Sequence, residues 1–185
     1  MATNLELKAS LASIKDARER AAALGGVSKG TLLQRDTYFR VPRGRLKLRE
    51  CVGSGSELIY YERDEMAPER WSQYVKEPVG NREGLGRVLE KALGVRAVID
   101  KKRDLYLYKN ARIHIDEVAG LGTFIEFEVE GNDPAASMSL MQELRECFGV
   151  RTESLIRASY GEMMEEASAR NGKPPPVTAG GGRAA

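Results

Sequence analysis

The chain has 185 residues, 42% of them hydrophobic, which suits one ordinary globular domain. Its 29 Lys and Arg and 27 Asp and Glu leave a net charge of +2, which argues against a dedicated nucleic-acid binder or a cationic membrane-surface protein. Two cysteines and a single histidine exclude a disulfide scaffold and a multi-histidine metal site.

In chain order, period-two alternation predicts strands, and capping residues with terminal glycines predict helices between them. The order is strand Asn4–Leu11, helix Ile14–Leu24, strands Leu33–Val41, Gly44–Cys51, Ser56–Asp64 and Trp71–Glu77, helix Arg82–Leu93, strands Val98–Tyr108, Ala111–Val118 and Gly122–Glu130, and helices over 134–148 and Arg157–Ala169. Mostly sequential strands with short links predict an antiparallel sheet of the α+β class, with helices on one side.

The two ends of the sequence give further expectations. The amino terminus lacks the layout of a signal peptide, and no apolar run approaches the roughly 20 residues of a membrane-spanning helix. Free Cys51 and Cys147 in such a chain predict a cytoplasmic protein with no membrane partner. Residues 171–185 are rich in Pro and Gly, so we expect a disordered tail after one domain over residues 1–170.

Several predicted strands carry apolar residues on one face and charged residues on the other. The charged faces hold Asn4, Glu6 and Lys8; Arg45, Lys47 and Arg49; Lys101 and Arg103; Arg112, His114 and Asp116; and Glu126, Glu128 and Glu130. A sheet with helices on one side and water on the other is the commonest cause of this pattern. Against that reading, these positions are mostly Arg, Lys, Glu and Asp, and bases and acids fall on different strands.

Eight strands are also enough to close a barrel that holds side chains or one small ligand. If the charged faces point inward, the buried charges must be matched. A polyanion with bound metal would match them, because Arg and Lys hold phosphates and carboxylates hold Mg²⁺. Glu126 and Glu128 lie two apart on one strand, roughly 6–7 Å between Cα atoms, so both reach one metal region.

These residues resemble the CYTH family, the triphosphate tunnel metalloenzymes that include class IV adenylyl cyclases and thiamine triphosphatases. The amino-terminal Glu-x-Glu-x-Lys signature stands as residues 4–8, NLELK, and the late signature as 112–118 followed by 120–128, GLGTFIEFE. Between them, basic runs at 45–49, 60–63 and 101–103 fall where the family has its basic strands. The resemblance covers about residues 3–165.

The resemblance implies an eight-stranded antiparallel closed barrel, the triphosphate tunnel, with helices packed on the outside. It implies Mg²⁺ or Mn²⁺ bound by Glu6, Glu126 and Glu128, with Asp116 as a further ligand or a partner of a ligand. Seven residues are implied phosphate binders, and Lys8 and Arg63 are also the catalytic candidates. The phosphate binders are Lys8, Lys47, Arg49, Arg63, Lys101, Arg103 and Arg112.

Asn4 stands where the signature has its first Glu, which should weaken one metal position. His114 shares the face of Asp116, but a lone histidine there is more often a hydrogen-bonded structural group than a base. The first functional hypothesis is a class IV adenylyl cyclase that converts ATP to cyclic AMP and pyrophosphate. The alternatives are a hydrolase of inorganic or thiamine triphosphate and a non-catalytic binder of polyphosphate or nucleotide. The expected partner is thus a small triphosphate, and a homodimer is left open.

Overall fold

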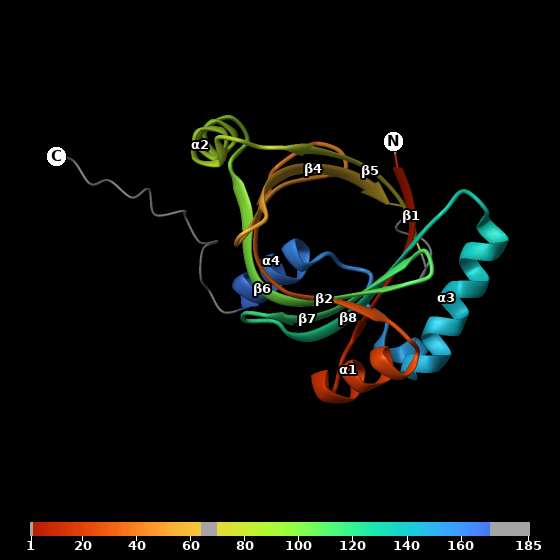
Figure 1. Cartoon of the computed structure of the whole chain (residues 1–185). Coiled ribbons are helices and arrows are strands. Elements are labelled where there is room, and N and C mark those ends of the chain that lie inside the picture. Colours follow the sequence, from red (N-terminus) through yellow and green to blue (C-terminus); the bar gives the residue numbers. More distant parts are fainter. Residues whose placement is uncertain (1, 64–69, 171–185) are drawn as a thin grey trace.

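A computed structural model describes residues 2–63 and 70–170, and its centre is a closed β-barrel (Figure 1). The strands follow one another around the barrel in the order β1-β5-β4-β3-β2-β6-β7-β8, and every neighbouring pair is antiparallel. The ring closes where β1 pairs with both β5 and β8. The predicted closed eight-stranded antiparallel barrel is therefore confirmed.

The described elements follow the predicted order. The strands are β1 (Ala2–Ser10), β2 (Val27–Phe39), β3 (Arg45–Cys51), β4 (Gly55–Arg63), β5 (Arg70–Pro78), β6 (Val95–Tyr108), β7 (Ala111–Val118) and β8 (Gly122–Glu130). The helices are α1 (Ile14–Ala23), α2 (Arg82–Leu93), α3 (Pro134–Phe148), the short 3₁₀ turn η1 (Thr152–Ser154) and α4 (Tyr160–Arg170). None of these described helices has the length and apolar character to cross a membrane.

The largest difference from the predicted bounds is at β2, which begins at Val27 and not at Leu33. Its first part still pairs with β6, but the register shifts between Ser28 and Thr31. Gly30 lies in this shift with φ +87°, a conformation that glycine adopts at little cost. The irregularity breaks the period-two pattern, which is why the alternation was visible only from Leu33 onward. The predicted tail and Asp64 at the end of the fourth strand lie outside the described residues.

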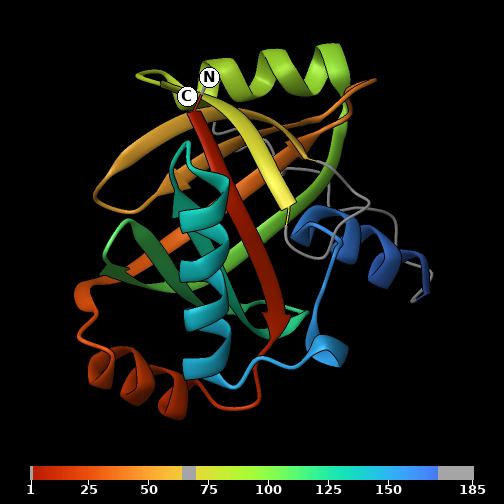
Figure 2. The same cartoon turned by 90° about the vertical axis from the view of Figure 1, so that its right-hand side faces the viewer.

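The main apolar core lies on the outer face of the barrel, between β1, β7 and β8 and the helices α1 and α3. Leu7, Ile113 and Phe127 from the strands are almost fully buried, and Leu140 and Leu144 from α3 belong to the same cluster. The helix α3 crosses over β1 and β8 in Figure 2. Alternation therefore sends apolar side chains outward to these helices and leaves the opposite face of the same strands to the interior.

The helix α4 lies at one end of the barrel, whereas α1 and α3 pack against the outer face of the strands. Looking along the barrel in Figure 1, α4 lies within the ring of strands. Tyr160 at its start packs with Ile99, Phe124 and other inward side chains in a second apolar cluster. The interior is thus apolar at the α4 end, and its charged part begins beyond Tyr160.

Candidate functional site

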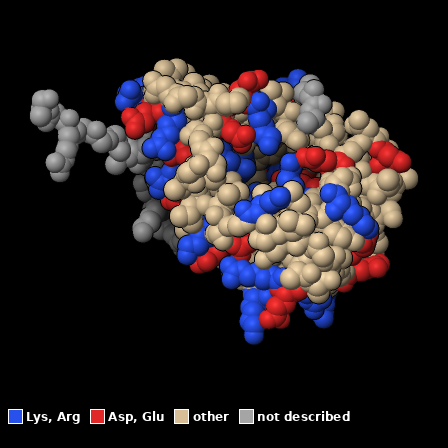
Figure 3. All heavy atoms as spheres, viewed as in Figure 1, with Lys and Arg blue, Asp and Glu red and all other residues tan. Residues whose placement is uncertain are grey.

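The barrel interior contains a cavity of about 300 Å³ lined by inward-facing side chains of all eight strands. In Figure 3, Lys, Arg, Asp and Glu atoms surround a hollow in the surface. All the predicted site residues line this cavity except Asp116, which is fully buried. Those that line it are Glu6, Lys8, Lys47, Arg49, Arg63, Lys101, Arg103, Arg112, Glu126 and Glu128.

One wall of the cavity is organised by Asp36 on β2, a fully buried residue that the sequence reading missed. Its carboxylate accepts two hydrogen bonds from Arg49, at 2.7 and 2.8 Å, and contacts Lys101 Nζ at 2.8 Å and Lys47 Nζ at 3.2 Å. Burial alone would raise the pKa of Asp36, but these cations hold it well below its usual range. Asp36 thus fixes three predicted phosphate binders in one cluster.

A second ionic cluster joins β1, β6, β7 and β8. Arg103 donates to both oxygens of Asp116, at 2.7 and 2.5 Å, and to Glu126 Oε2 at 2.5 Å. Lys8 Nζ lies 3.1 Å from Glu126 Oε1. Tyr160 also donates its hydroxyl to Asp116 Oδ2 at 2.8 Å, so both carboxylate oxygens of Asp116 accept hydrogen bonds from the protein. In this structure Asp116 therefore holds Arg103 in place from behind the cavity.

The carboxylates of Glu6 and Glu128 have different electrostatic surroundings. Glu6 lies 3.6 Å from Arg63 Nη1, and burial together with repulsion from Glu128 raises its pKa to about 7. Burial also acts to raise the pKa of Glu128, but the neighbouring His114 and Arg112 lower it to about 2. At neutral pH the carboxyl group of Glu6 is therefore close to half-protonated, whereas that of Glu128 is ionised.

Arg112 lies between Glu128, Glu130 and the amino-terminal strand. Its Nε donates to Glu128 Oε2 at 2.9 Å, and its Nη1 lies 2.5 Å from Glu130 Oε1. The amide oxygen of Asn4, placed to suit its neighbours, accepts from Arg112 Nη2 at 3.1 Å, while its nitrogen donates to the Thr3 carbonyl. Both polar atoms of the Asn4 side chain thus form hydrogen bonds within the protein, and Asn4 supplies no carboxylate to the cavity.

Within residues 2–63 and 70–170, one group of potential metal ligands has donor atoms all within 4.8 Å of one another: His114, Glu126 and Glu128. The predicted ligands Glu126 and Glu128 are in this group, and Glu6 and Asp116 are not. His114 Nδ1 lies 3.7 Å from Glu126 Oε2 and 3.7 Å from Glu128 Oε1. Burial and the nearby Arg103 lower the pKa of His114, which favours the neutral imidazole.

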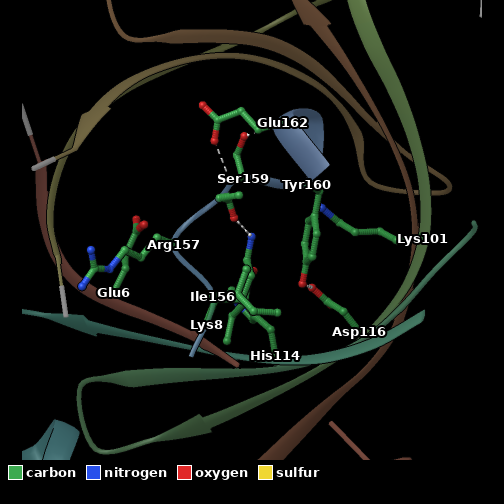
Figure 4. Close-up of polar contacts among 12 residues, drawn as sticks. Glu6, Lys8, Lys101, His114, Asp116, Ile156, Arg157, Ser159, Tyr160 and Glu162 are labelled. Atoms are coloured by element: carbon green, nitrogen blue, oxygen red, sulfur yellow. Dashed lines mark hydrogen bonds and ion pairs between the residues drawn. The ribbon is translucent and has the colours of Figure 1, made fainter. Parts of the chain in front are cut away.

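The segment before α4 also reaches the site (Figure 4). Lys8 donates to the Ala158 carbonyl at 3.1 Å, and its ammonium lies 3.7 Å from the centre of the Tyr160 ring. Tyr160 points from the start of α4 to Asp116 in the figure. Arg70 donates to the Arg157 and Ile156 carbonyls. The carboxy-terminal segment is thus built into the back of the cavity.

Sequence reasoning missed two kinds of residue here. A signal for Asp36 existed, because Gln34, Asp36 and Tyr38 alternate on one face of their strand and all line or support the cavity. Tyr160 had no such signal, since nothing in a short amphipathic helix says that its first residue enters a barrel. The contacts of Tyr160 depend on where the chain after α3 returns.

Basic side chains outnumber carboxylates at the cavity in the part of the chain that the structure describes. Among the described residues, nine basic side chains and three carboxylates line it, and Asp36 and Asp116 add two carboxylates behind. Burial and neighbouring cations lower the pKa of Lys47 to about 7, and burial lowers that of Lys101 to about 8. Burial disfavours the charged form of a lysine, and an anion bound among these cations would favour it again.

A closed antiparallel barrel with buried cations on one wall and clustered carboxylates on another defines an anion-binding tunnel protein. The family model of the CYTH domain matches residues 2–160, and the chain belongs to the CYTH family. Members of this family act on triphosphates, are metal-dependent in general, and are adenylyl cyclase-like or triphosphatase enzymes. The protein is therefore an enzyme of one of these two kinds, and the predicted family is confirmed.

Solved structures share the fold at low sequence identity. The PH1012 protein of Pyrococcus horikoshii OT3 has a TM-score of 0.80 and 23% identity, covering 86% of this chain and 98% of that one. A candidate adenylate cyclase of Vibrio parahaemolyticus has a TM-score of 0.74 and 17% identity, covering 88% and 98%. HpAC1 of Hippeastrum, a candidate adenylyl cyclase with a dominant triphosphatase activity, has a TM-score of 0.62 and 16% identity, covering 95% and 98%. No curated protein matches the chain.

Proposed function

We propose that this protein binds a triphosphate compound in the barrel cavity and cleaves one of its phosphoanhydride bonds with the help of a divalent metal ion. The observation that carries the proposal is the excess of basic over acidic side chains that line the cavity. Among the described residues, nine basic side chains and three carboxylates line the cavity, and Asp36 and Asp116 lie behind it. A triphosphate brings four or so negative charges in a compact group, which suits this excess.

The basic residues divide the work of holding the phosphates. Arg49 and Arg103 are each oriented by a buried carboxylate, Asp36 or Asp116, so their guanidinium groups are fixed before an anion arrives. Such preorganised donors stabilise charge that develops on phosphate oxygens without having to reorient. Lys8, Arg63 and Arg112 lie on the side of the carboxylates, and we assign Lys8 and Arg63 to the phosphoryl oxygens at the reacting bond.

The residues present fit a divalent metal. Glu126 and Glu128 offer carboxylate oxygens on adjacent inward positions of β8, and Glu6 lines the same cavity from β1. Oxygen donors of this type suit Mg²⁺ and Mn²⁺. When bound, the ion would neutralise negative charge on the phosphate oxygens.

The first candidate reaction is the cyclisation of ATP, in which the ribose 3′ hydroxyl displaces pyrophosphate from the α-phosphorus. A nucleotide needs room for its organic part as well as for its phosphates. Leu32, Tyr74 and Leu105 line the same cavity as the cations. Leu105 is the next inward residue after Arg103 on β6. It lies farther along the strand from Ile99, which packs against Tyr160 of α4. These apolar side chains favour a substrate with an organic group.

The second candidate is hydrolysis, in which water attacks the terminal phosphorus of inorganic triphosphate, thiamine triphosphate or ATP. The bond to the bridging oxygen breaks and releases phosphate and the diphosphate product. The dominant triphosphatase activity named for the Hippeastrum protein, which shares this fold, supports considering it. Both reactions use the same cations and differ in which phosphorus meets the nucleophile.

The deciding experiment incubates the purified protein with ATP, inorganic triphosphate or thiamine triphosphate and with Mg²⁺ or Mn²⁺, and resolves products by chromatography. Cyclic AMP and pyrophosphate from ATP support the cyclase. Free phosphate without cyclic AMP supports the hydrolase. Tight binding with no turnover of any of the three compounds would refute the enzymatic proposal and leave a binder.

The matched variants are Glu126→Gln and Glu143→Gln. Glu126 faces Lys8 and Arg103 in the cavity, whereas Glu143 is an exposed partner of Lys109 on α3. We expect Glu126→Gln to abolish turnover and Glu143→Gln to leave it unchanged. A fully active Glu126→Gln protein would contradict the site as drawn.

A further inference from the structure

His114 on β7 presents a buried nitrogen that the protein does not satisfy. Its residue exposure is 4%, and Nδ1 has no hydrogen-bond partner among the described residues. Its neighbours Glu126 Oε2 and Glu128 Oε1 are both 3.7 Å away, beyond hydrogen-bond length. A buried polar atom without a partner is costly and uncommon in folded proteins, so this one needs a physical reason.

The three side chains are held by a rigid scaffold. His114 and Glu126 are directly opposite each other in the β7–β8 pairing, and Glu128 is the next inward residue on β8. Arg112 engages Glu128 through Oε2 and leaves Oε1 on the side of His114. Glu126 Oε2 is shared with Arg103, so that contact would have to loosen on metal binding.

The spacing of the donor atoms suits a metal ion. For bonds of about 2.1 Å, adjacent ligand atoms of an octahedral ion lie about 3.0 Å apart and opposite ones about 4.2 Å. Both distances from His114 Nδ1, 3.7 Å each, fall between these values. Changes of about 0.5 to 0.7 Å in these distances would complete the geometry. The Asn4 amide faces Arg112 and the Thr3 carbonyl, and adds no carboxylate.

We infer that His114 is a nitrogen ligand of the metal ion, together with Glu126 and Glu128, and that the site prefers a first-row transition ion to Mg²⁺. Imidazole is a common ligand of transition ions, whereas Mg²⁺ prefers oxygen donors. The inference rests on the metal site of the proposed function and adds to it the donor type and the metal class.

The test uses Mn²⁺ as the probe and needs no substrate. His114 is the only histidine in the sequence, so in a preparation without a histidine tag or imidazole buffer no other residue can supply an imidazole. We expect pulsed EPR of the Mn²⁺-loaded protein to detect coupling to a directly bound ¹⁴N. We also expect His114→Gln to abolish the coupling and to weaken Mn²⁺ binding about tenfold or more, with Mg²⁺ binding changed far less.

The outcomes separate this inference from the proposed function. Bound Mn²⁺ without ¹⁴N coupling in the unchanged protein would overturn the inference, even if triphosphate turnover is intact. Coupling without turnover of any triphosphate would uphold the ligand assignment and refute the enzymatic proposal. Equal losses of Mn²⁺ and Mg²⁺ affinity in His114→Gln would overturn the claimed preference. The wild-type spectrum decides the ligand question even if the variant fails to fold.

Discussion

Asp36→Asn tests whether the cation wall of the cavity depends on one buried carboxylate. The substitution keeps the shape of the side chain and removes its charge. Asp36 is fully buried, and its oxygens contact Arg49, Lys47 and Lys101 at 2.7–3.2 Å. In the variant these cations remain buried without their counterion, and an amide cannot accept from all of them with both of its polar atoms.

The expected cost follows from the burial of the cluster. Removing one partner of a buried ion pair costs about 3–5 kcal/mol, because the remaining charge stays uncompensated. For a protein of this size, that corresponds to a fall in melting temperature of about 6–20 °C. Lys47 can lessen the cost by releasing its proton, since its pKa is already lowered to about 7. We therefore expect a value near the lower end of this range.

The matched control is Asp100→Asn. Asp100 also accepts two hydrogen bonds from one arginine, Arg35, each at 2.7 Å, but both side chains are about half exposed. Exposed pairs of this kind contribute at most about 1 kcal/mol. The two variants thus share their chemistry and hydrogen-bond geometry and differ in burial.

Urea denaturation followed by circular dichroism measures both unfolding free energies. We expect the dependence of the unfolding free energy on urea concentration to be the same in both variants. The urea concentration at the unfolding midpoint should be much lower in Asp36→Asn than in Asp100→Asn. Inorganic triphosphate should recover part of the loss in Asp36→Asn, because it supplies negative charge to the same cations. If Asp36→Asn costs no more than Asp100→Asn, the cluster is not the buried, charge-matched unit described above.

Four further predictions concern anion binding and the stability of the protein. Bound triphosphate should raise the pKa values of Lys47 and Lys101 from about 7 and about 8, so binding should take up protons and its affinity should fall from pH 7 to 9. Calorimetry in buffers of different ionisation enthalpy would detect the proton uptake. In the protein alone the sign is opposite: the folded pKa of Lys47 lies below 10.5, so its contribution to stability rises with pH between about 7 and 10.5. Arg49→Ala should weaken triphosphate binding by about tenfold with little loss of stability, because two lysines still compensate Asp36. Arg103→Ala should weaken binding and also lower the melting temperature. Equal melting temperatures of the two variants would argue against this difference in pairing. Leu105→Gln should raise the KM for ATP about fivefold or more and leave that for inorganic triphosphate unchanged, and a parallel rise for both would refute the apolar subsite.

Arg49 and Arg103 also illustrate a limit of reasoning from strand faces. Alternation predicts that both point inward, and inward cations without a ligand would be expected to repel one another. The structure instead gives each its own buried carboxylate, Asp36 or Asp116. Mutating either arginine therefore changes ligand binding and internal pairing together, to different degrees.

The sequence by itself determined the strands, their charged and apolar faces and the family, and the family resemblance implied that the charged faces point inward. Period-two alternation is a local property, so it survives in the one-dimensional sequence and separates Leu5 and Leu7 from Glu6 and Lys8 without knowledge of any neighbour. Its largest miss is around Gly30, where a local irregularity breaks the pattern. Residues carried over from the family signatures, Asp116 apart, then lined one cavity.

Only the tertiary structure decided which charges meet. Asp36 lies far from Lys101 in the sequence. Their contact exists because β2 pairs with β6, although β3, β4, β5 and α2 lie between them in the chain. The same holds for Tyr160, which reaches Asp116 because α4 returns to one end of the barrel. Pairing energies between buried groups depend on distances and burial in space, and neither quantity is encoded in the periodicity of a single strand.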